Sequence, residues 1–385
     1  MPSIAVAYLI AAAGSAGSVE GPRLLPEGRV RFELSAPMAQ GVSLRLDSLG
    51  IVPMIRDEAG SWQLEVGPLM PDIYTYTFIV DRKVVGDERN PLRKPAHDGG
   101  YESILVVPST TDVPWQSPTR GLGDLYVTRF HSSLYQETRE ALVYLPRTVS
   151  KSHRAKLPML ILLHGVREDQ YAWSTAGRAP QILQNLMDEG KAQPMVIVMP
   201  LGYGFSDSHR RVGELFSMSP RRQKETMDSL AEHILEELVP HVESHFPVSQ
   251  TRAIAGLSMG GAQALYLGMK HPRQFSHVGS FGGAFMMYGA DSSLWFGDNS
   301  EREVPEIMIR CGESDFVMTA NNVVRKWLDE RGIAHVSSNT PGGHEWRVWN
   351  RDLANFLPTL FRTERRSASL KQRGATPALR LSRTD

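Results

Sequence analysis

The pattern of hydrophobic and polar positions changes character near residue 110 of this chain. Between residues 28 and 107, hydrophobic residues mostly alternate with polar ones, as in VRFELSAP, VSLRL, SWQLEVGPL and YTYTFIVD, and Gly, Pro and Asp stand between these runs. Alternation with a period of two places the hydrophobic side chains on one face of a β-strand. The sequence therefore predicts a small antiparallel β-sandwich over residues 21–108.

The second part of the chain alternates between short hydrophobic strands and helical stretches. The runs MLILLHG, MVIVMP, AIAGLS and EIMIRCG are almost continuously hydrophobic, and a helical stretch follows each of them. Strands of this kind are typical of a parallel sheet that helices cover on both faces. We therefore predict an α/β domain with a mostly parallel sheet over residues 123–362.

Three segments fall outside these two domains. Residues 109–122 are predicted to be a linker between two separate cores, because the stretch PSTTDVPWQSPTRG at residues 108–121 is rich in Pro, Ser and Thr. Residues 363–385 form a basic tail without a hydrophobic period, and we expect this tail to be disordered. Residues 1–20 contain a hydrophobic run and AAAGSAGS, which resemble a secretory signal, although no Lys or Arg precedes them. This leader favours a secreted or periplasmic location and leaves a cytoplasmic one open.

Charge and composition restrict the partners of the protein. The 385 residues include 42 Lys and Arg and 42 Asp and Glu, so the formal net charge is zero. Such a chain has no overall field that attracts nucleic acid or an anionic membrane, and we expect neither as a partner. No run reaches the roughly 18 consecutive apolar residues of a membrane span. The only cysteine is Cys311, which excludes an intrachain disulfide framework.

The motif GLSMG at residues 256–260 is the strongest chemical signal in the sequence. The strand RAIAGLS precedes Ser258, and the helical stretch GGAQALYLGMKHP follows it. Glycine tolerates positive φ and close backbone approach, so Gly-x-Ser-x-Gly between a strand and a helix indicates a tight turn that exposes the serine hydroxyl. We predict that Ser258 is a nucleophile.

A serine nucleophile needs a base and a group that orients this base. In nucleophile-elbow enzymes the chain order is serine, then Asp or Glu, then histidine. His344 in PGGHEW is the predicted general base and acid, and Asp315 in GESDF is the predicted carboxylate partner. Glu313 competes with Asp315, because a loop can direct either carboxylate inward.

The oxyanion of a tetrahedral intermediate needs backbone donors. We predict the amides of Met259, directly after the nucleophile, and of Val166, after LILLHG. His164 in that motif is predicted to brace the loop and not to act as a second base. This chemistry requires no cofactor and no metal ion.

Several ordered motifs together resemble a known family. LLHGVREDQYAW, GKAQPMVIVMP, RAIAGLSMGGAQAL, IRCGESDF and PGGHEWRVWNRDLANFLPTLF resemble the esterase D-like α/β-hydrolases, which include feruloyl, acetylxylan and enterochelin esterases. The resemblance implies an α/β-hydrolase domain in which Ser258, Asp315 and His344 form the triad. It also implies an oxyanion hole built from Val166 and Met259. The front part, from GRVRFELSAP to VVGDERNP, is similar to immunoglobulin-like modules related to glycogen-binding modules.

The resemblance implies a serine esterase that acts on feruloyl or acetyl esters of plant-type carbohydrate. The alternatives are an enterochelin (siderophore) esterase, a non-catalytic carbohydrate-binding protein, or transfer of the acyl group to an acceptor other than water. The expected partner is a small or polysaccharide-linked ester. Residues 203–222 are expected to cover the site, and their arginines could make this cover basic: Arg210, Arg211, Arg221 and Arg222.

Three other features have a structural and a functional interpretation. In HVESH, His241 and His245 lie one helical turn apart and could bind zinc, but a solvated helix face is favoured. Trp62, Tyr74 and Tyr76 could stack on sugars, but aromatic residues in alternating strands more often pack in a core. The arginines of the tail are expected to be solvated.

Overall fold

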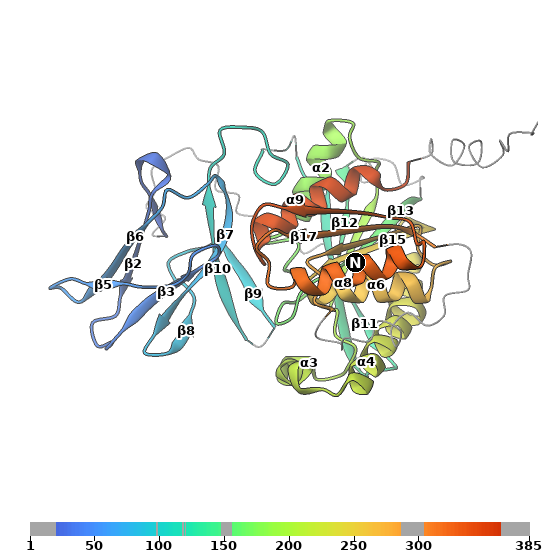
Figure 1. The fold of residues 1–385 in the computed structure, drawn as a ribbon, viewed down its shortest axis with the longest axis horizontal. Helices are drawn as coiled ribbons and strands as arrows, with labels where there is room; N and C mark the ends of the chain where they lie inside the picture. Colours follow the sequence, from blue (N-terminus) through green and yellow to red (C-terminus); the bar gives the residue numbers. More distant parts are fainter. Residues whose placement is uncertain are drawn as a thin grey trace, which may run out of the picture.

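The computed structural model consists of a β-strand region beside a larger α/β region (Figure 1). It describes residues 21–97, 99–117, 119, 121–147, 156–285 and 304–362, without the side chains of Arg210 and Phe216. The predicted leader and the predicted basic tail with its arginines lie outside the described residues, so secretion and tail disorder stay predictions.

The N-terminal region is an antiparallel β-sandwich, as the alternating pattern predicts. One sheet has the order β1 (Arg23–Leu24), β2 (Val30–Ser35), β6 (Ser61–Val66) and β5 (Ile55–Arg56). The other has the order β4 (Gly50–Pro53), β3 (Val42–Leu46), β7 (Asp72–Val80), β10 (Gly100–Val107) and β9 (Arg93–Ala96), and β8 (Lys83–Val85) pairs with β7. A short 3-10 helix, η1 (Pro26–Gly28), connects β1 and β2.

The aromatic residues of the sandwich pack in its core. Trp62, Tyr74 and Tyr76 are all buried in one hydrophobic cluster, and the ring of Tyr76 packs edge-on against Phe32 at a centroid distance of 5.0 Å. The core interpretation of these three residues is therefore confirmed. Because their rings are covered, they offer no exposed surface for a sugar.

The second region contains a mostly parallel sheet of eight strands, as predicted. The strand order is β11 (Asp124–Ser132), β12 (Glu137–Leu145), β14 (Val196–Pro200), β13 (Leu157–Leu163), β15 (Val248–Leu257), β16 (His277–Phe281), β17 (Glu306–Gly312) and β18 (His335–Thr340). The pairs β11–β12 and β12–β14 are antiparallel, and the others are parallel. The parallel strands therefore all end at one edge of the sheet.

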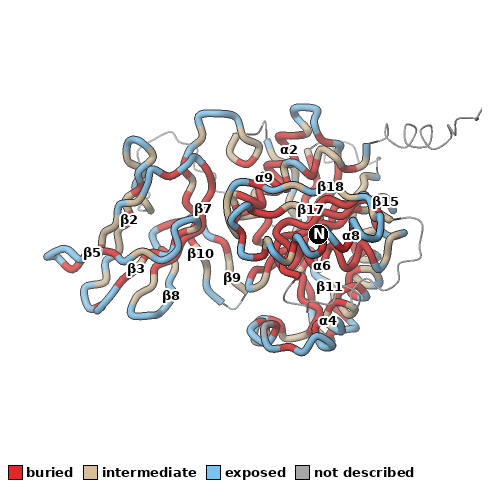
Figure 2. Tube along the Cα trace, in the orientation of Figure 1, coloured by how far each residue is buried: buried red, intermediate tan, exposed pale blue. Residues whose placement is uncertain are grey.

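Helices cover both faces of this sheet. On one face lie α2 (Ala179–Asp188), α9 (Trp346–Phe356) and η5 (Leu357–Thr359). On the other lie α4 (Pro220–Glu232), the π-helix η3 (His233–Leu238), α5 (Val239–His245), α6 (Met259–Lys270) and α8 (Met318–Glu330). Between β14 and α4, the chain forms α3 (Ser208–Arg211) and η2 (Val212–Ser217). The central strands are buried along their length, whereas the sandwich has long exposed edges and turns (Figure 2).

The two regions meet in a shared hydrophobic cluster. Ile73 and Ile104 of the sandwich, together with Trp115, are buried in the same cluster as residues of α2 and α9. Trp115 lies in the segment predicted as a linker, and its indole N–H donates to Asp72 Oδ1 at 3.0 Å. The sandwich has a hydrophobic cluster of its own, and the two regions meet in this second, shared cluster in addition. An alternating pattern shows that one strand face is buried, but it does not show which part of the chain covers it.

The domain boundaries stay predictions. The last sandwich strand ends at Val107 and the first strand of the large sheet begins at Asp124, so the predicted linker occupies the interval between them. Within the described residues, no helix is both long and hydrophobic enough to cross a lipid bilayer.

Candidate active site

Ser258 lies at the turn between β15 and α6, as the motif predicts. Its backbone has φ 51° and ψ −117°, an uncommon conformation for a residue with a side chain. The turn is held from both sides, since the Ser258 N–H donates to the Phe281 carbonyl at 2.9 Å and the Ala284 N–H donates to the Ser258 carbonyl at 2.9 Å. This backbone places the Ser258 side chain at the carboxyl edge of the sheet.

The glycines that flank Ser258 serve close packing. The positive φ expected of the motif belongs to Ser258, and neither Gly256 nor Gly260 has a positive φ. A Cβ atom on Gly260 would lie 2.6 Å from the carbonyl oxygens of Leu163 and His164, and one on Gly256 would lie 2.5 Å from the Gly260 carbonyl carbon. The motif therefore lets the end of β15 and the start of α6 pack closely, and brings Gly260 against the end of β13.

The structure brings Ser258, His344 and Asp315 together. His344 Nε2 lies 2.9 Å from Ser258 Oγ, and His344 Nδ1 lies 2.9 Å from both carboxylate oxygens of Asp315. With Nδ1–H donated to the carboxylate, Nε2 is free to accept the serine proton. Asp315 is buried, and its Oδ1 also accepts the Val317 N–H at 3.0 Å. Glu313 is exposed to solvent, so only the Asp315 carboxylate contacts the imidazole.

The imidazole of His344 lies between two aromatic rings. The buried ring of Trp349 packs edge-on at a centroid distance of 4.9 Å, and the ring of Phe316 lies 4.6 Å away. Phe316 is 70% exposed although its ring contacts a buried site. Sequence reasoning did not identify Phe316, even though this residue directly follows Asp315 in GESDF.

The loop after β13 carries Val166, the second predicted donor. Burial lowers the pKa of His164 to about 4, so its ring is neutral at physiological pH. The Gly202 N–H donates to His164 Nε2 at 2.9 Å, and His164 Nδ1–H donates to the Gly165 carbonyl at 2.7 Å. His164 therefore braces the loop, as expected. The backbone N–H of Val166 and that of Met259 form no hydrogen bond to another described residue.

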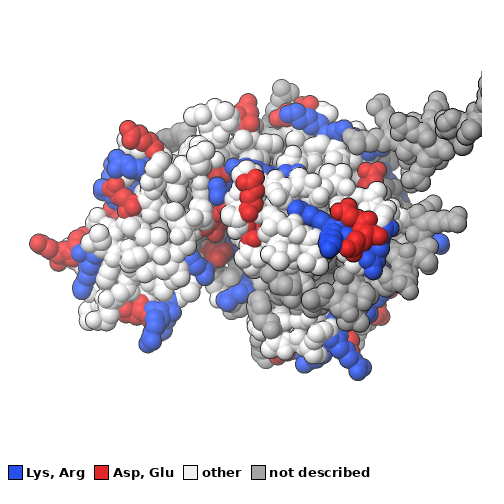
Figure 3. All heavy atoms as spheres, viewed as in Figure 1, with Lys and Arg blue, Asp and Glu red and all other residues white. Residues whose placement is uncertain are grey.

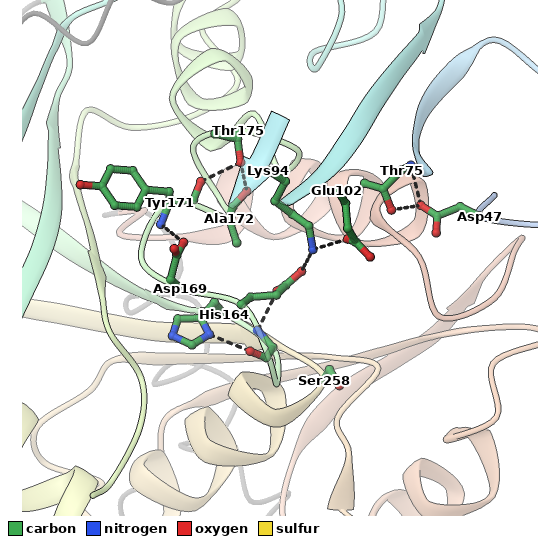
Figure 4. A network of polar contacts seen from close by, with 12 residues as sticks. Asp47, Thr75, Lys94, Glu102, His164, Asp169, Tyr171, Ala172, Thr175 and Ser258 are labelled. Carbon is green, nitrogen blue, oxygen red and sulfur yellow. Dashed lines mark hydrogen bonds and ion pairs between the residues drawn. The ribbon is translucent and has the colours of Figure 1, made fainter. Parts of the chain in front are cut away.

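The sandwich reaches this loop through Lys94 on β9. Its ammonium group lies 2.7 Å from Glu102 on β10 and 2.7 Å from Glu168 on the loop after β13. Figure 4 shows Lys94 and Glu102 facing each other between the sandwich strands and the loop that carries His164, with Ser258 nearby. Sequence reasoning missed this contact, because a single lysine in a polar strand position carries no signal of its distant partner.

The predicted cover also contacts the sandwich. His97 Nε2 lies 2.8 Å from Ser208 Oγ in α3, and the His97 N–H donates to the Arg167 carbonyl at 2.9 Å. Two of the predicted basic residues are paired with acids, Arg211 with Glu214 at 3.1 Å and Arg221 with Glu225 at 3.0 Å. The side chain of Arg210 lies outside the described residues. Arg222 is exposed.

Charges of both signs occur over both regions on the face that Figure 3 shows. Among the described residues, no group of three or more His, Cys, Asp and Glu side chains is placed to hold a metal ion. His241 of the predicted pair is half-buried against β11, and its Nε2 lies 2.6 Å from Thr128 Oγ1, whereas His245 is exposed. The solvated-face interpretation therefore holds only for His245.

A serine at a strand-to-helix turn, in a mostly parallel sheet flanked by helices, defines the fold as an α/β-hydrolase. Residues 132–360 match the family described as "Esterase: Putative esterase", and the chain belongs to this family.

Two curated relatives are esterases by name. The chain is 27% identical over 357 residues to an endo-1,4-beta-xylanase/feruloyl esterase of Xylanibacter ruminicola, covering 89% of this chain and 46% of that protein. It is 26% identical over 169 residues to an acetyl esterase of Caldicellulosiruptor saccharolyticus, covering 34% of this chain and 64% of that protein. The chain thus matches about half to two thirds of the length of these relatives.

Solved structures share the fold. The enterobactin esterase FES from Shigella flexneri has a TM-score of 0.67 at 18% identity, covering 89% of this chain and 97% of that one. A CE1 ferulic acid esterase from Anaeromyces mucronatus has a TM-score of 0.56 at 22% identity, covering 65% of this chain and 96% of that one. At such identities the likeness concerns the fold alone.

Proposed function

We propose that the protein is a serine carboxylic ester hydrolase that acts through an acyl-enzyme. The observation that carries this proposal is the continuous contact from Ser258 Oγ through His344 to the buried Asp315, with 2.9 Å at each step. A strained turn that holds a serine against an imidazole is costly for a protein that only binds. Membership of the Esterase family supports the same chemistry.

The proposed reaction has two halves. In the first, Ser258 Oγ attacks the ester carbonyl carbon while its proton passes to His344 Nε2. The tetrahedral intermediate collapses as His344 returns this proton to the leaving alcohol oxygen, and the acyl group stays on Ser258. In the second half, water attacks the acyl carbon, His344 takes and returns the proton in the same way, and the free acid leaves.

The other residues have supporting roles in this proposal. Asp315 holds the Nδ1–H tautomer of His344 and stabilises the imidazolium that forms. The N–H groups of Met259 and Val166 stabilise the negative oxygen of the tetrahedral intermediate. Met259 begins α6, where the helix dipole also favours negative charge. No step requires a metal ion or a cofactor.

For the substrate we propose feruloyl or acetyl esters of plant-type carbohydrate. Support comes from the names of the two curated relatives and from the exposed ring of Phe316 beside His344. Because His344 returns its proton to the leaving oxygen, Phe316 lies on the side of the leaving alcohol. An exposed aromatic face suits the apolar face of a sugar ring. The buried aromatic residues of the sandwich do not support sugar binding by that region.

A substrate panel tests this proposal. We expect the protein to hydrolyse p-nitrophenyl acetate and either methyl ferulate or acetylated xylan, and the Ser258→Ala variant to be inactive on all of them. Hydrolysis of enterobactin alone would favour the siderophore alternative and leave the serine chemistry intact. Binding of xylan without hydrolysis of any ester would favour the non-catalytic alternative.

The Phe316→Ala variant tests the assignment of the leaving-group side. We expect KM for acetylated xylan to rise about threefold to tenfold, because the sugar loses one apolar contact. KM for p-nitrophenyl acetate measures the change in a substrate without a sugar and should rise less. Equal changes on both substrates would contradict a sugar contact at Phe316.

A further inference from the structure

The contact between the sandwich and the loop after β13 is a buried charge network. Lys94 and Glu168 are 5% and 7% exposed, and their charged atoms lie 2.7 Å apart. Burial alone would lower the pKa of Lys94, but the carboxylates of Glu168 and Glu102 raise this pKa above its ordinary value. Lys94 therefore stays a cation, and each of its two carboxylate partners has a nearby positive charge.

Glu168 connects this cation to the backbone beside the serine. Its Oε1 accepts from Lys94, while its Oε2 accepts the Gly165 N–H at 2.9 Å. Gly165 lies against the nucleophile, since a Cβ atom at this position would be 3.5 Å from Ser258 Cβ and 2.7 Å from Leu257 Cδ1. The Lys94 ion pair is thus one hydrogen bond away from the residue that precedes Val166.

The geometry of one peptide group transmits this restraint to Val166. The carbonyl of Gly165 and the N–H of Val166 belong to the same planar trans peptide, so they point in opposite directions. His164 Nδ1–H holds that carbonyl at 2.7 Å, and Glu168 holds the N–H on the other side of Gly165. Because hydrogen bonds fix both the N–H and the carbonyl of Gly165, they also fix the direction of the Val166 N–H.

We propose that Lys94 of the sandwich is a positioning residue for the oxyanion donor Val166, so that the N-terminal region is part of the catalytic machinery. This inference rests on the proposed ester hydrolysis at Ser258. Without Lys94, Glu168 is a buried carboxylate that has lost its nearest cation, and such a group moves toward water or another partner. Its Oε2 then releases the Gly165 N–H, and the Val166 donor loses its fixed direction.

The first experiment compares Lys94→Met with the double variant Lys94→Met/Glu168→Gln in the full chain. In Lys94→Met we expect kcat for p-nitrophenyl acetate to fall about tenfold to hundredfold with little change in KM, because the donor acts on the intermediate. Inhibition by phenylboronic acid, which becomes tetrahedral when Ser258 adds to it, should weaken by a similar factor. In the double variant the neutral amide oxygen again accepts the Gly165 N–H, and kcat should largely recover.

A second pair of variants gives a test that does not require the Lys94→Met variant to fold. Glu168→Gln and Glu168→Met both remove the carboxylate that pairs with Lys94, but only glutamine keeps an acceptor for Gly165. We expect Glu168→Gln to keep a kcat at least tenfold above that of Glu168→Met.

Arg351→Met is the matched control for a general weakening of the contact between the sandwich and the α/β region. Arg351 on α9 pairs with the buried Asp72 of the sandwich, so it joins the same two regions without contacting the loop after β13. We expect this variant to unfold at a lower temperature and to keep its kcat and its boronic acid affinity.

The outcomes separate this inference from the proposed function. If the wild-type protein hydrolyses esters but Lys94→Met keeps its kcat, or if Arg351→Met loses as much, the positioning role of Lys94 is wrong while the serine chemistry stands. Equal kcat values in Glu168→Gln and Glu168→Met would also overturn it. If the wild-type protein hydrolyses no ester, or if Ser258→Ala hydrolyses esters as well as the wild type does, the proposed function fails and this inference fails with it.

Discussion

The two loops that supply the proposed oxyanion donors are built in different ways. The turn around Ser258 is made by neighbours in sequence, since Gly256 and Gly260 provide the space and α6 begins at Met259. The loop after β13 is held by distant residues: Gly202 and Tyr203 after β14, and Lys94 of the sandwich. Two donors for one oxygen atom thus depend on local geometry in one case and on long-range contacts in the other.

These two loops touch each other at Gly260. Its backbone packs directly against the carbonyl oxygens of Leu163 and His164, so the start of α6 rests on the end of β13. A change in either loop therefore shifts one donor relative to the other. Catalytic groups tolerate little displacement, because an error of about 1 Å costs about a hundredfold in rate.

The largest effect is expected at the centre of the turn. Ser258→Ala should lower kcat about ten-thousandfold to a millionfold, because it removes the covalent step and little buried volume. Ester hydrolysis and a circular dichroism spectrum measure activity and folding. A folded variant with activity near that of the wild type would show that the turn does not carry the nucleophile.

Asp315→Asn should lower kcat about a thousandfold to ten-thousandfold, because the amide favours the wrong tautomer of His344. Glu313→Gln is the matched control, since this side chain is only two residues away but exposed. We expect the Glu313 variant to keep wild-type activity. A larger loss in Glu313→Gln than in Asp315→Asn would identify the wrong carboxylate.

Gly260→Ala tests the contact between the two loops. The added Cβ would lie 2.6 Å from two backbone oxygens that cannot rotate away. We expect kcat to fall about tenfold to hundredfold and the free energy of unfolding to fall by about 1–3 kcal/mol.

Gly41→Ala in the sandwich is the control for the added methyl group, because nothing lies within 4 Å of the Cβ position there. Its activity and its unfolding temperature should match those of the wild type. The same kcat in Gly260→Ala and Gly41→Ala would mean that the two loops do not need this close contact.

The last prediction concerns acid, which is expected to change stability and not kcat through the loop after β13. The pKa of His164 is about 4 in the folded protein and 6.5 in an unperturbed histidine, because burial disfavours its charged form. Between these two values the unfolded chain binds a proton that the folded protein does not bind. The contribution of His164 to the free energy of unfolding therefore falls as pH decreases through this window, by about 1.4 kcal/mol per pH unit for one proton.

Urea unfolding measures this slope at several pH values between about 6 and 4.5. In roughly this window the unfolded chain, but not the folded protein, binds the proton of His164. The wild-type slope also contains a contribution of the same sign from His233, whose pKa burial lowers to about 4. Asp47 and Asp169 contribute with the opposite sign, because burial raises their pKa values to about 7 and about 6. In His164→Asn the slope should decrease by about one proton. An unchanged slope would show that His164 is protonated in the folded protein or exposed.

Much of the fold was predictable because it depends on residues that are close in sequence. The period-two runs predicted the sandwich, and the continuous hydrophobic runs predicted the parallel sheet. The motif predicted the turn at Ser258 and its position between β15 and α6. The turn is where the motif predicts it, but the positive φ belongs to Ser258 and not to the glycines.

The approach of Asp315 and His344 to Ser258 was predictable for a different reason. Parallel strands end at the same edge of a sheet, so residues that follow β15, β17 and β18 meet there whatever lies between them in sequence. The choice between Asp315 and Glu313 stayed open, because the direction of a loop side chain depends on its packing. In the structure Asp315 is buried in contact with His344, and Glu313 faces solvent.

By itself, the sequence determined the two architectures, the turn at Ser258 and the strand ends that carry Asp315 and His344. Only the tertiary structure decided that two isoleucines of the sandwich join the hydrophobic cluster of α2 and α9, and that Lys94 pairs with Glu168. Periodicity and turn motifs are written in neighbouring residues, because they reflect the local geometry of the backbone. A buried ion pair between residues 74 positions apart depends on which two surfaces the whole fold brings together, and neither residue type indicates that partner on its own.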